Sequence, residues 1–154
     1  NLINGMQKGL VAELSGDDVG LLWLSDQSKT SDAVAMLNAH QKEAHIQKVL
    51  FGESLKLLFR DPQKDSRSPD IIIKPDFGVI YTKPTNETIA EHGGFNDEDT
   101  NVPLLIANPA LNAEEIHTAV QTTQIAPTIL YLLRLDPAAL RAVQIEKTRR
   151  LPGL

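Results

Sequence analysis

The stretch of the chain best suited to chemistry is AEHGGFNDEDTNVPLLIANP, residues 90–109, where one histidine stands before two glycines. Imidazole is a common zinc ligand, so His92 is a candidate metal ligand. Gly93 and Gly94 permit a positive φ and close backbone approach, which would leave room for the imidazole at a strand end facing a crevice. On spacing alone, a turn residue in front of a buried strand is the simpler interpretation.

The other titratable residues give weaker signals. His40 and His45 are separated by about 140 degrees on the helix predicted there, so they cannot readily share one ion. His117 lies in a polar loop, where a surface role is at least as plausible as a site role. The acidic run at 97–99 is typical of a solvated loop, and we assign none of its carboxylates as ligands. His92 is therefore the one metal-ligand candidate.

Composition limits the classes of function. With 154 residues, 42% hydrophobic and 23% charged, the chain has the size and composition of one globular domain. Its net charge of -5 argues against general nucleic-acid binding, and the absence of cysteine excludes disulfides and thiolate sites. No apolar run is long enough to span a bilayer. The first residue is not methionine, which suggests a processed chain or a piece of a longer one. A sequon at Asn86 would fit N-glycosylation in a secreted protein.

The hydrophobic pattern predicts strands that alternate with helices. Apolar runs predict buried strands at 19–24 and 102–109, and the stretch 70–82 fits either a hairpin or a strand interrupted by a turn. Leu105 would lie in the core, so that its replacement by Ala would cost about 2–5 kcal/mol. Amphipathic helices are expected at 29–44, 52–62 and 122–135, with Pro127 in a first turn and Asp136 capping a short turn after the last helix. The expected fold is α/β, with a partly or largely parallel sheet flanked by helices and a single domain over 1–154.

Two segments in order resemble a known family. EHGGFNDEDTNVPLLIANP followed by VQTTQIAPTILYLLRLDP is similar to the C-terminal part of the alkaline phosphatase superfamily, in its type I phosphodiesterase and nucleotide pyrophosphatase branch. In that family a histidine-glycine motif precedes an apolar strand, and a DIAPTIL-like segment begins a C-terminal helix. SPDIIIKPDFGVIYT also resembles the segment before the histidine motif, so the likeness covers most of residues 19–140.

The resemblance implies a hydrolase of phosphodiester or nucleotide pyrophosphate bonds with two divalent ions, usually zinc, in which His92 matches a metal ligand. The resemblance also implies a hydrogen-bond acceptor for the ring nitrogen of His92 that does not bind the metal. The family's threonine or serine nucleophile and its remaining ligands lie upstream of the matched region, and none is found in these residues. We therefore expect a C-terminal fragment of such a domain, whose partner is the missing N-terminal part and whose substrate is a small phosphate ester or nucleotide. The alternative is a non-catalytic α/β binding or remnant module.

Overall fold

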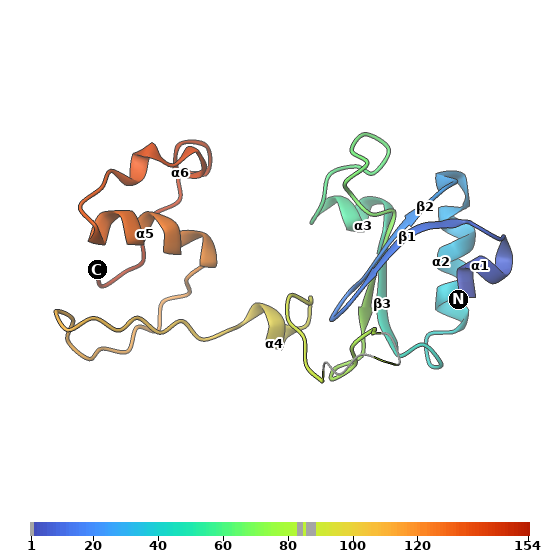
Figure 1. Ribbon diagram of the computed structural model, residues 1–154, viewed down its shortest axis with the longest axis horizontal. Helices are drawn as coiled ribbons and strands as arrows, with labels where there is room; N and C mark the ends of the chain where they lie inside the picture. Colours follow the sequence, from blue (N-terminus) through green and yellow to red (C-terminus); the bar gives the residue numbers. More distant parts are fainter. Residues whose placement is uncertain (1, 83–84, 86–88) are drawn as a thin grey trace. The chain divides into compact units, whose positions relative to one another are not determined.

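A computed structural model describes residues 2–82, 85 and 89–154 of the protein, and it forms two compact units, 1–104 and 105–154. Each unit is described by itself, and the expectation of a single domain stays a prediction. The sequon residue Asn86 lies outside the described residues. In the first unit the elements are α1 (Leu2–Met6), β1 (Val11–Gly16), β2 (Gly20–Leu24), a 3-10 turn (Gln27–Lys29), α2 (Thr30–Ala39), β3 (Ile46–Phe51), α3 (Gly52–Lys56), β4 (Ile71–Pro75) and α4 (Asp97–Thr100) (Figure 1).

The first unit is built on a four-stranded sheet in the order β1-β2-β4-β3, and every neighbouring pair is antiparallel. The α/β class is thus confirmed, but the expectation of a parallel sheet is wrong for the described residues. The reason is topological. Helix α2 does connect two strands, β2 and β3, that run in the same direction. Strand β4 lies between them and runs in the opposite direction, so that both of its pairings are antiparallel.

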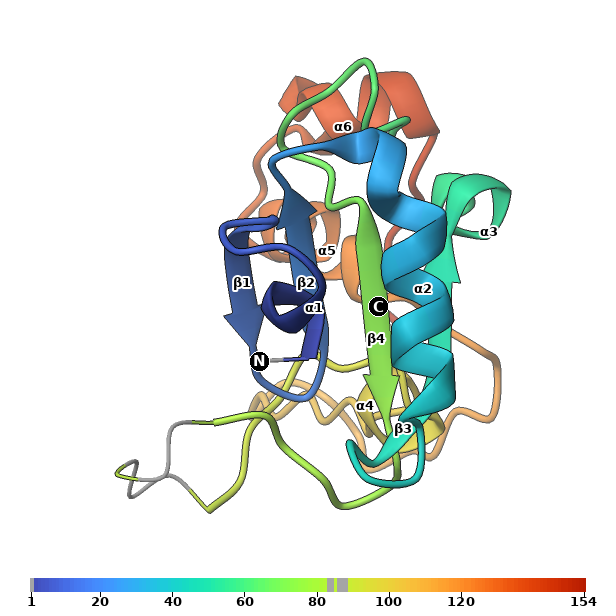
Figure 2. The ribbon, with the colours of Figure 1, turned by 90° about the vertical axis from the view of Figure 1, so that its right-hand side faces the viewer.

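Both faces of this sheet are covered. Helices α1 and α2 lie on one face (Figure 2), where Leu22, Leu37 and Ile73 are buried together. On the other face Leu55 of α3 packs with Leu50 and Ile72. Figure 1 shows α3 and α2 on opposite sides of the sheet. Strand β4 is central and almost fully buried, which explains its continuous apolar run.

Several expected elements are confirmed, and others are wrong. Strands at 19–24 and at the start of 70–82 are present as β2 and β4, but 77–82 forms no strand. The predicted helix at 29–44 stops at Ala39, because residues 40–45 form a turn that ends at His45 with a φ of 51°. The segment 102–109 is not a buried strand, since it has no regular structure and the Leu105 side chain is 90% exposed.

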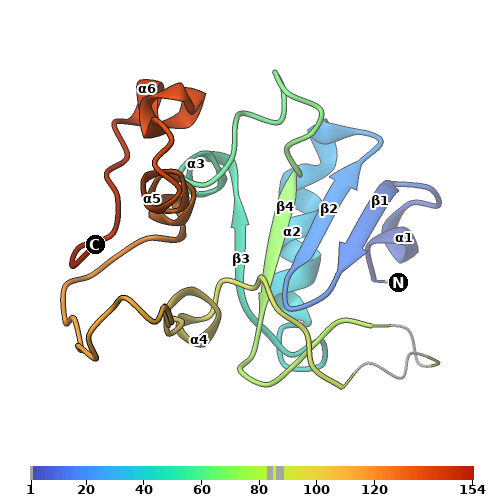
Figure 3. The ribbon, with the colours of Figure 1, turned by 60° about the vertical axis from the view of Figure 1, so that its left-hand side comes forward.

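The second unit consists of a 3-10 turn (Thr122–Gln124), α5 (Ile125–Leu132), a 3-10 turn (Pro137–Ala139) and α6 (Arg141–Glu146), which Figure 3 shows with α5 and α6 joined by the second turn. Pro127 lies in the first turn of α5, and the Asp136 side chain accepts a hydrogen bond from the Ala138 N–H, so both predictions are confirmed. The C-terminal segment is attached to α5 because the buried Leu151 N–H donates to the Thr128 hydroxyl oxygen at 2.8 Å.

Candidate functional site

The segment that carries His92 passes against the turn between β1 and β2. This turn is held from two sides: the Asp17 N–H donates to the Val19 carbonyl at 3.0 Å, and the Tyr81 N–H donates to the Asp17 carbonyl at 2.9 Å. The turn therefore holds Asp18 at a fixed place beside Gly94.

The two glycines after His92 have separate structural roles. Gly93 has a φ of 95° with open space around it, so it supplies a backbone conformation that side chains disfavour. Gly94 is buried, and a Cβ there would lie 2.8 Å from the Asp18 Cβ and 2.9 Å from the Asp18 carbonyl oxygen, with the Asp99 carboxylate also in contact. The expectation that these glycines permit positive φ and close approach is confirmed, one residue for each property.

Two acidic residues, Asp18 and Asp99, thus border Gly94, two residues after His92. Asp18 is only 9% exposed, and its Oδ2 atom is buried with no hydrogen-bond partner among the described residues. Asp99 lies in the short helix α4, where its Oδ2 accepts a hydrogen bond from the Asn96 N–H at 3.2 Å. The His92 side chain is exposed, so its ring has room to reorient.

Burial and neighbouring charge act together on Asp18. Burial raises the pKa of the Asp18 carboxyl above its ordinary value, the negative charges of Asp99 and Asp17 raise it further, and His92 opposes them. A positive charge next to this carboxylate would relieve both the burial penalty and the repulsion from its acidic neighbours. The site therefore favours a cation or a proton donor.

The donor set matches part of a zinc site. Imidazole nitrogen and carboxylate oxygen are both zinc donors. Across the described ranges, however, no group of three or more His, Asp or Glu residues is arranged to hold a metal ion. His92 could contribute one ligand, and further ligands would have to come from outside this arrangement.

The remaining histidines have local partners instead. His40 ends α2 with its Nδ1 at 2.9 Å from the Met36 carbonyl. The His45 ring lies 3.9 Å from the Asp76 carboxylate, and the His117 ring lies 3.9 Å from that of Glu115. The prediction of one helix carrying both His40 and His45 is wrong, since α2 ends at Ala39 and His45 lies in the turn that follows.

Sequence reasoning did not identify the two acidic residues that border Gly94, Asp18 and Asp99. The sequence pattern predicts only a solvated acidic run around Asp99, and it assigns no role to Asp17 or Asp18. The available signal was a pair of aspartates in a tight turn bounded by Gly16 and Gly20. Nothing in the pattern indicates that this turn meets residue 94, because the two lie far apart in the chain.

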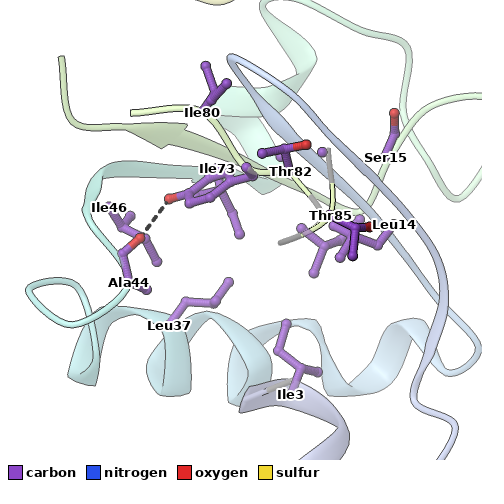
Figure 4. Close-up of a pocket in the computed structure, with 14 residues that line it drawn as sticks. Ile3, Leu14, Ser15, Leu37, Ala44, Ile46, Ile73, Ile80, Thr82 and Thr85 are labelled. Atoms are coloured by element: carbon purple, nitrogen blue, oxygen red, sulfur yellow. Dashed lines mark hydrogen bonds between the residues drawn. The ribbon is translucent and has the colours of Figure 1, made fainter. Parts of the chain in front are cut away.

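A separate cavity of about 1070 Å³ lies between the sheet and the helices of the first unit. Ile3, Leu37 and Ile73 point into it (Figure 4), and the Tyr81 hydroxyl at its edge donates to the Ala44 carbonyl at 3.0 Å. Among the described residues, its lining is mainly apolar with a few hydroxyl groups and includes no histidine or carboxylate.

In the part of the chain that the structure describes, no helix combines the length and apolar character needed to cross a membrane. Comparison with family models, with curated proteins and with solved structures found no match to this chain.

Proposed function

We propose that this chain contributes His92 as a metal ligand to a zinc-dependent hydrolase of phosphodiester or nucleotide pyrophosphate bonds. The observation that carries the proposal is that two acidic residues, Asp18 and Asp99, border Gly94 and repel each other electrostatically, two residues after an exposed imidazole. Such a cluster is expensive to assemble from like charges unless a cation compensates them. The likeness of EHGGF and of the later IAPTIL segment to the alkaline phosphatase superfamily supports the same function.

Each residue of the site would have a distinct task. His92 would donate one ring nitrogen to an ion, while Gly93 sets the direction of the chain and Gly94 lets the turn with Asp18 come close. Two divalent ions would polarise the phosphoryl oxygens and activate the attacking group of a small phosphate ester or nucleotide. The nucleophile and the other ligands would belong to another part of the same alkaline-phosphatase-like domain.

The exposed apolar stretch at 102–106 supports an additional polypeptide partner. Leu105 is 90% exposed and Val102 is 55% exposed, although the pattern of this stretch is that of a strand buried on both faces. A secreted location would be consistent with the sequon at Asn86.

The test is the zinc content of the natively purified protein, measured together with hydrolysis of a chromogenic aryl phosphodiester. His92→Ala is expected to remove bound zinc and most activity, because an imidazole ligand is lost while the core is untouched. His117→Ala is the matched control, since its side chain is 82% exposed and paired only with a surface glutamate. Zinc content and turnover in His92→Ala equal to those of His117→Ala would refute the proposal.

A non-catalytic binding module is the second candidate, and the apolar cavity favours it. Ligand pockets are concave and mostly apolar, and the cavity beside Leu37 and Ile73 has that character. This function would be supported by a native protein that contains no zinc and hydrolyses no phosphodiester, but binds an apolar fluorescent probe that Ala44→Phe displaces.

A further inference from the structure

The apolar cavity of the first unit has a buried wall and an exposed end. Ile3, Leu22 and Leu37 line it from α1, β2 and α2, and they are only 2–4% exposed. Leu14, on the edge strand β1, is 56% exposed, and Figure 4 places it at the opposite end of the lined space from Ala44. The volume of about 1070 Å³ lies at the upper end of the roughly 300–1,000 Å³ usual for small-molecule sites, so there is room for an extended molecule.

The lining determines the chemistry that the body of such a molecule needs. Ile46 and Ile73 contribute aliphatic side chains from β3 and β4, and Figure 4 shows Ile3 and Leu37 on the helices below them. None of the described lining residues is an acid or a base. A carboxylate, phosphate or ammonium group would therefore lose its water without gaining an opposite charge, which is unfavourable. The cavity accordingly favours a neutral ligand with an aliphatic body.

At the Ala44 end the lining includes a hydroxyl group whose hydrogen is already in use. The Tyr81 hydroxyl donates to the Ala44 carbonyl at 3.0 Å, the bond dashed in Figure 4, and the His45 carbonyl oxygen lies 3.3 Å from the same hydroxyl. A phenol has one hydrogen to donate, but its oxygen can also accept. No described residue donates to this oxygen. The Tyr81 hydroxyl thus offers a ligand an acceptor and no donor.

The other end of the cavity discriminates less between polar groups. Ser15 lies there beside Leu14, and its side chain is exposed. A serine hydroxyl rotates freely and can either donate or accept, and an exposed one also exchanges partners with water. Selectivity for a polar group of the ligand therefore depends on the Tyr81 end.

We propose that this cavity binds a long-chain aliphatic alcohol, whose hydroxyl donates a hydrogen bond to the Tyr81 oxygen while its alkyl chain lies along Leu37 and Ile73 toward Leu14. The inference rests on the second candidate function, the non-catalytic binding module, and names its class of ligand. It does not depend on a metal role for His92.

The experiment measures displacement of the neutral dye N-phenylnaphthylamine from the purified protein by three competitors. Decanol carries the donor, nonyl methyl ether has the same number of heavy atoms without a donor, and decanoate carries a charge. Decanol is expected to bind more tightly than decanoate. Tyr81→Phe removes the acceptor, so it should lower the preference for decanol over the ether by about 2–10-fold, the value of one neutral hydrogen bond.

The preference is a ratio of two dissociation constants in the same variant, so a general change in the cavity cancels. Tyr131→Phe is the matched control, because it makes the same change in the second unit, at a side chain that is 45% exposed, and it should leave the ratio unchanged. Failure of the dye and of all three competitors to bind would overturn the binding module together with this inference. Displacement with an equal ratio in wild type and Tyr81→Phe, or tighter binding of decanoate than of decanol, would overturn the alcohol specificity and leave the binding module intact.

Discussion

Replacing Gly94 by alanine tests the geometry on which the candidate site depends. The added Cβ would meet the Asp18 Cβ at 2.8 Å and the Asp18 carbonyl oxygen at 2.9 Å. Because carbon atoms in favourable contact lie about 3.5–4.0 Å apart, the two segments would have to separate by about 0.7 Å or more. The Asp99 carboxylate, which also meets this position, is the end of a side chain and can swing away, but it then loses its hydrogen bond from the Asn96 N–H.

The backbone at Asp18 cannot move so easily. The turn is held by hydrogen bonds from Asp17 to Val19 and from Tyr81 to Asp17. Forced overpacking of this kind costs about 1–3 kcal/mol. We therefore expect Gly94→Ala to lower the free energy of unfolding by about 1–3 kcal/mol, and to move Asp18 away from the segment of His92.

The control is Gly93→Ala, one residue earlier. That position has open space but a φ of 95°, so alanine there should cost about 1–2 kcal/mol through backbone strain, without displacing Asp18. Urea denaturation measures the two costs, and amide chemical shifts at 17–19 report movement of the turn. A Gly94→Ala variant with wild-type stability and unshifted resonances at 17–19 would refute the close approach.

The remaining predictions concern the core and one surface carboxylate. Leu55→Ala is expected to lower the free energy of unfolding by about 2–5 kcal/mol, because Leu55 is fully buried. Leu105→Ala should change it by less than about 0.5 kcal/mol, because the Leu105 side chain is 90% exposed. Urea denaturation measures both changes, and equal losses of stability would contradict the fold. Hydrogen bonds from Arg67 lower the pKa of Asp65 to about 2, so the stability this pair contributes is complete above the ordinary pKa of 3.8 and is lost as pH falls toward 2. NMR titration should find the pKa of Asp65 raised toward 3.8 in Arg67→Ala, where the backbone N–H of residue 67 still donates to Asp65, and less changed in Arg60→Ala, since the Arg60 guanidinium is 3.7 Å away; an unchanged pKa in Arg67→Ala would exclude the side chain as a cause.

Local patterns predicted the elements whose signals are strong within a few residues. The continuous apolar run of β2 and the helix that begins at Thr30 are both present, as are the positions of Pro127 and Asp136. Strand β3 was missed because IQKVLF mixes polar and apolar residues between two helical patterns. Without β3 in the prediction, the insertion of β4 between β2 and β3 could not be foreseen, and a parallel sheet followed from the apparent alternation of strands and helices.

The stretch Val102-Pro103-Leu104-Leu105-Ile106 shows a different limit. Its apolar composition correctly indicates a segment whose exposure to water is unfavourable in free energy. Composition does not tell which surface covers it, and in the described structure none of its large apolar side chains is buried. A hydrophobic pattern therefore predicts that a segment should be buried. It does not predict which surface covers the segment, because that depends on contacts with residues elsewhere.

The same distinction applies to the site. His92 and its glycines are adjacent in sequence, so their chemistry and their backbone freedom could be inferred together. Asp18, in the turn between β1 and β2, is recognisable only through space, because the fold brings it close to Gly94 although the two are far apart in the sequence. Its unpaired oxygen is a property of the fold and not of the local sequence. Asp18 is thus a neighbour of the His92 segment that no spacing rule around His92 would select.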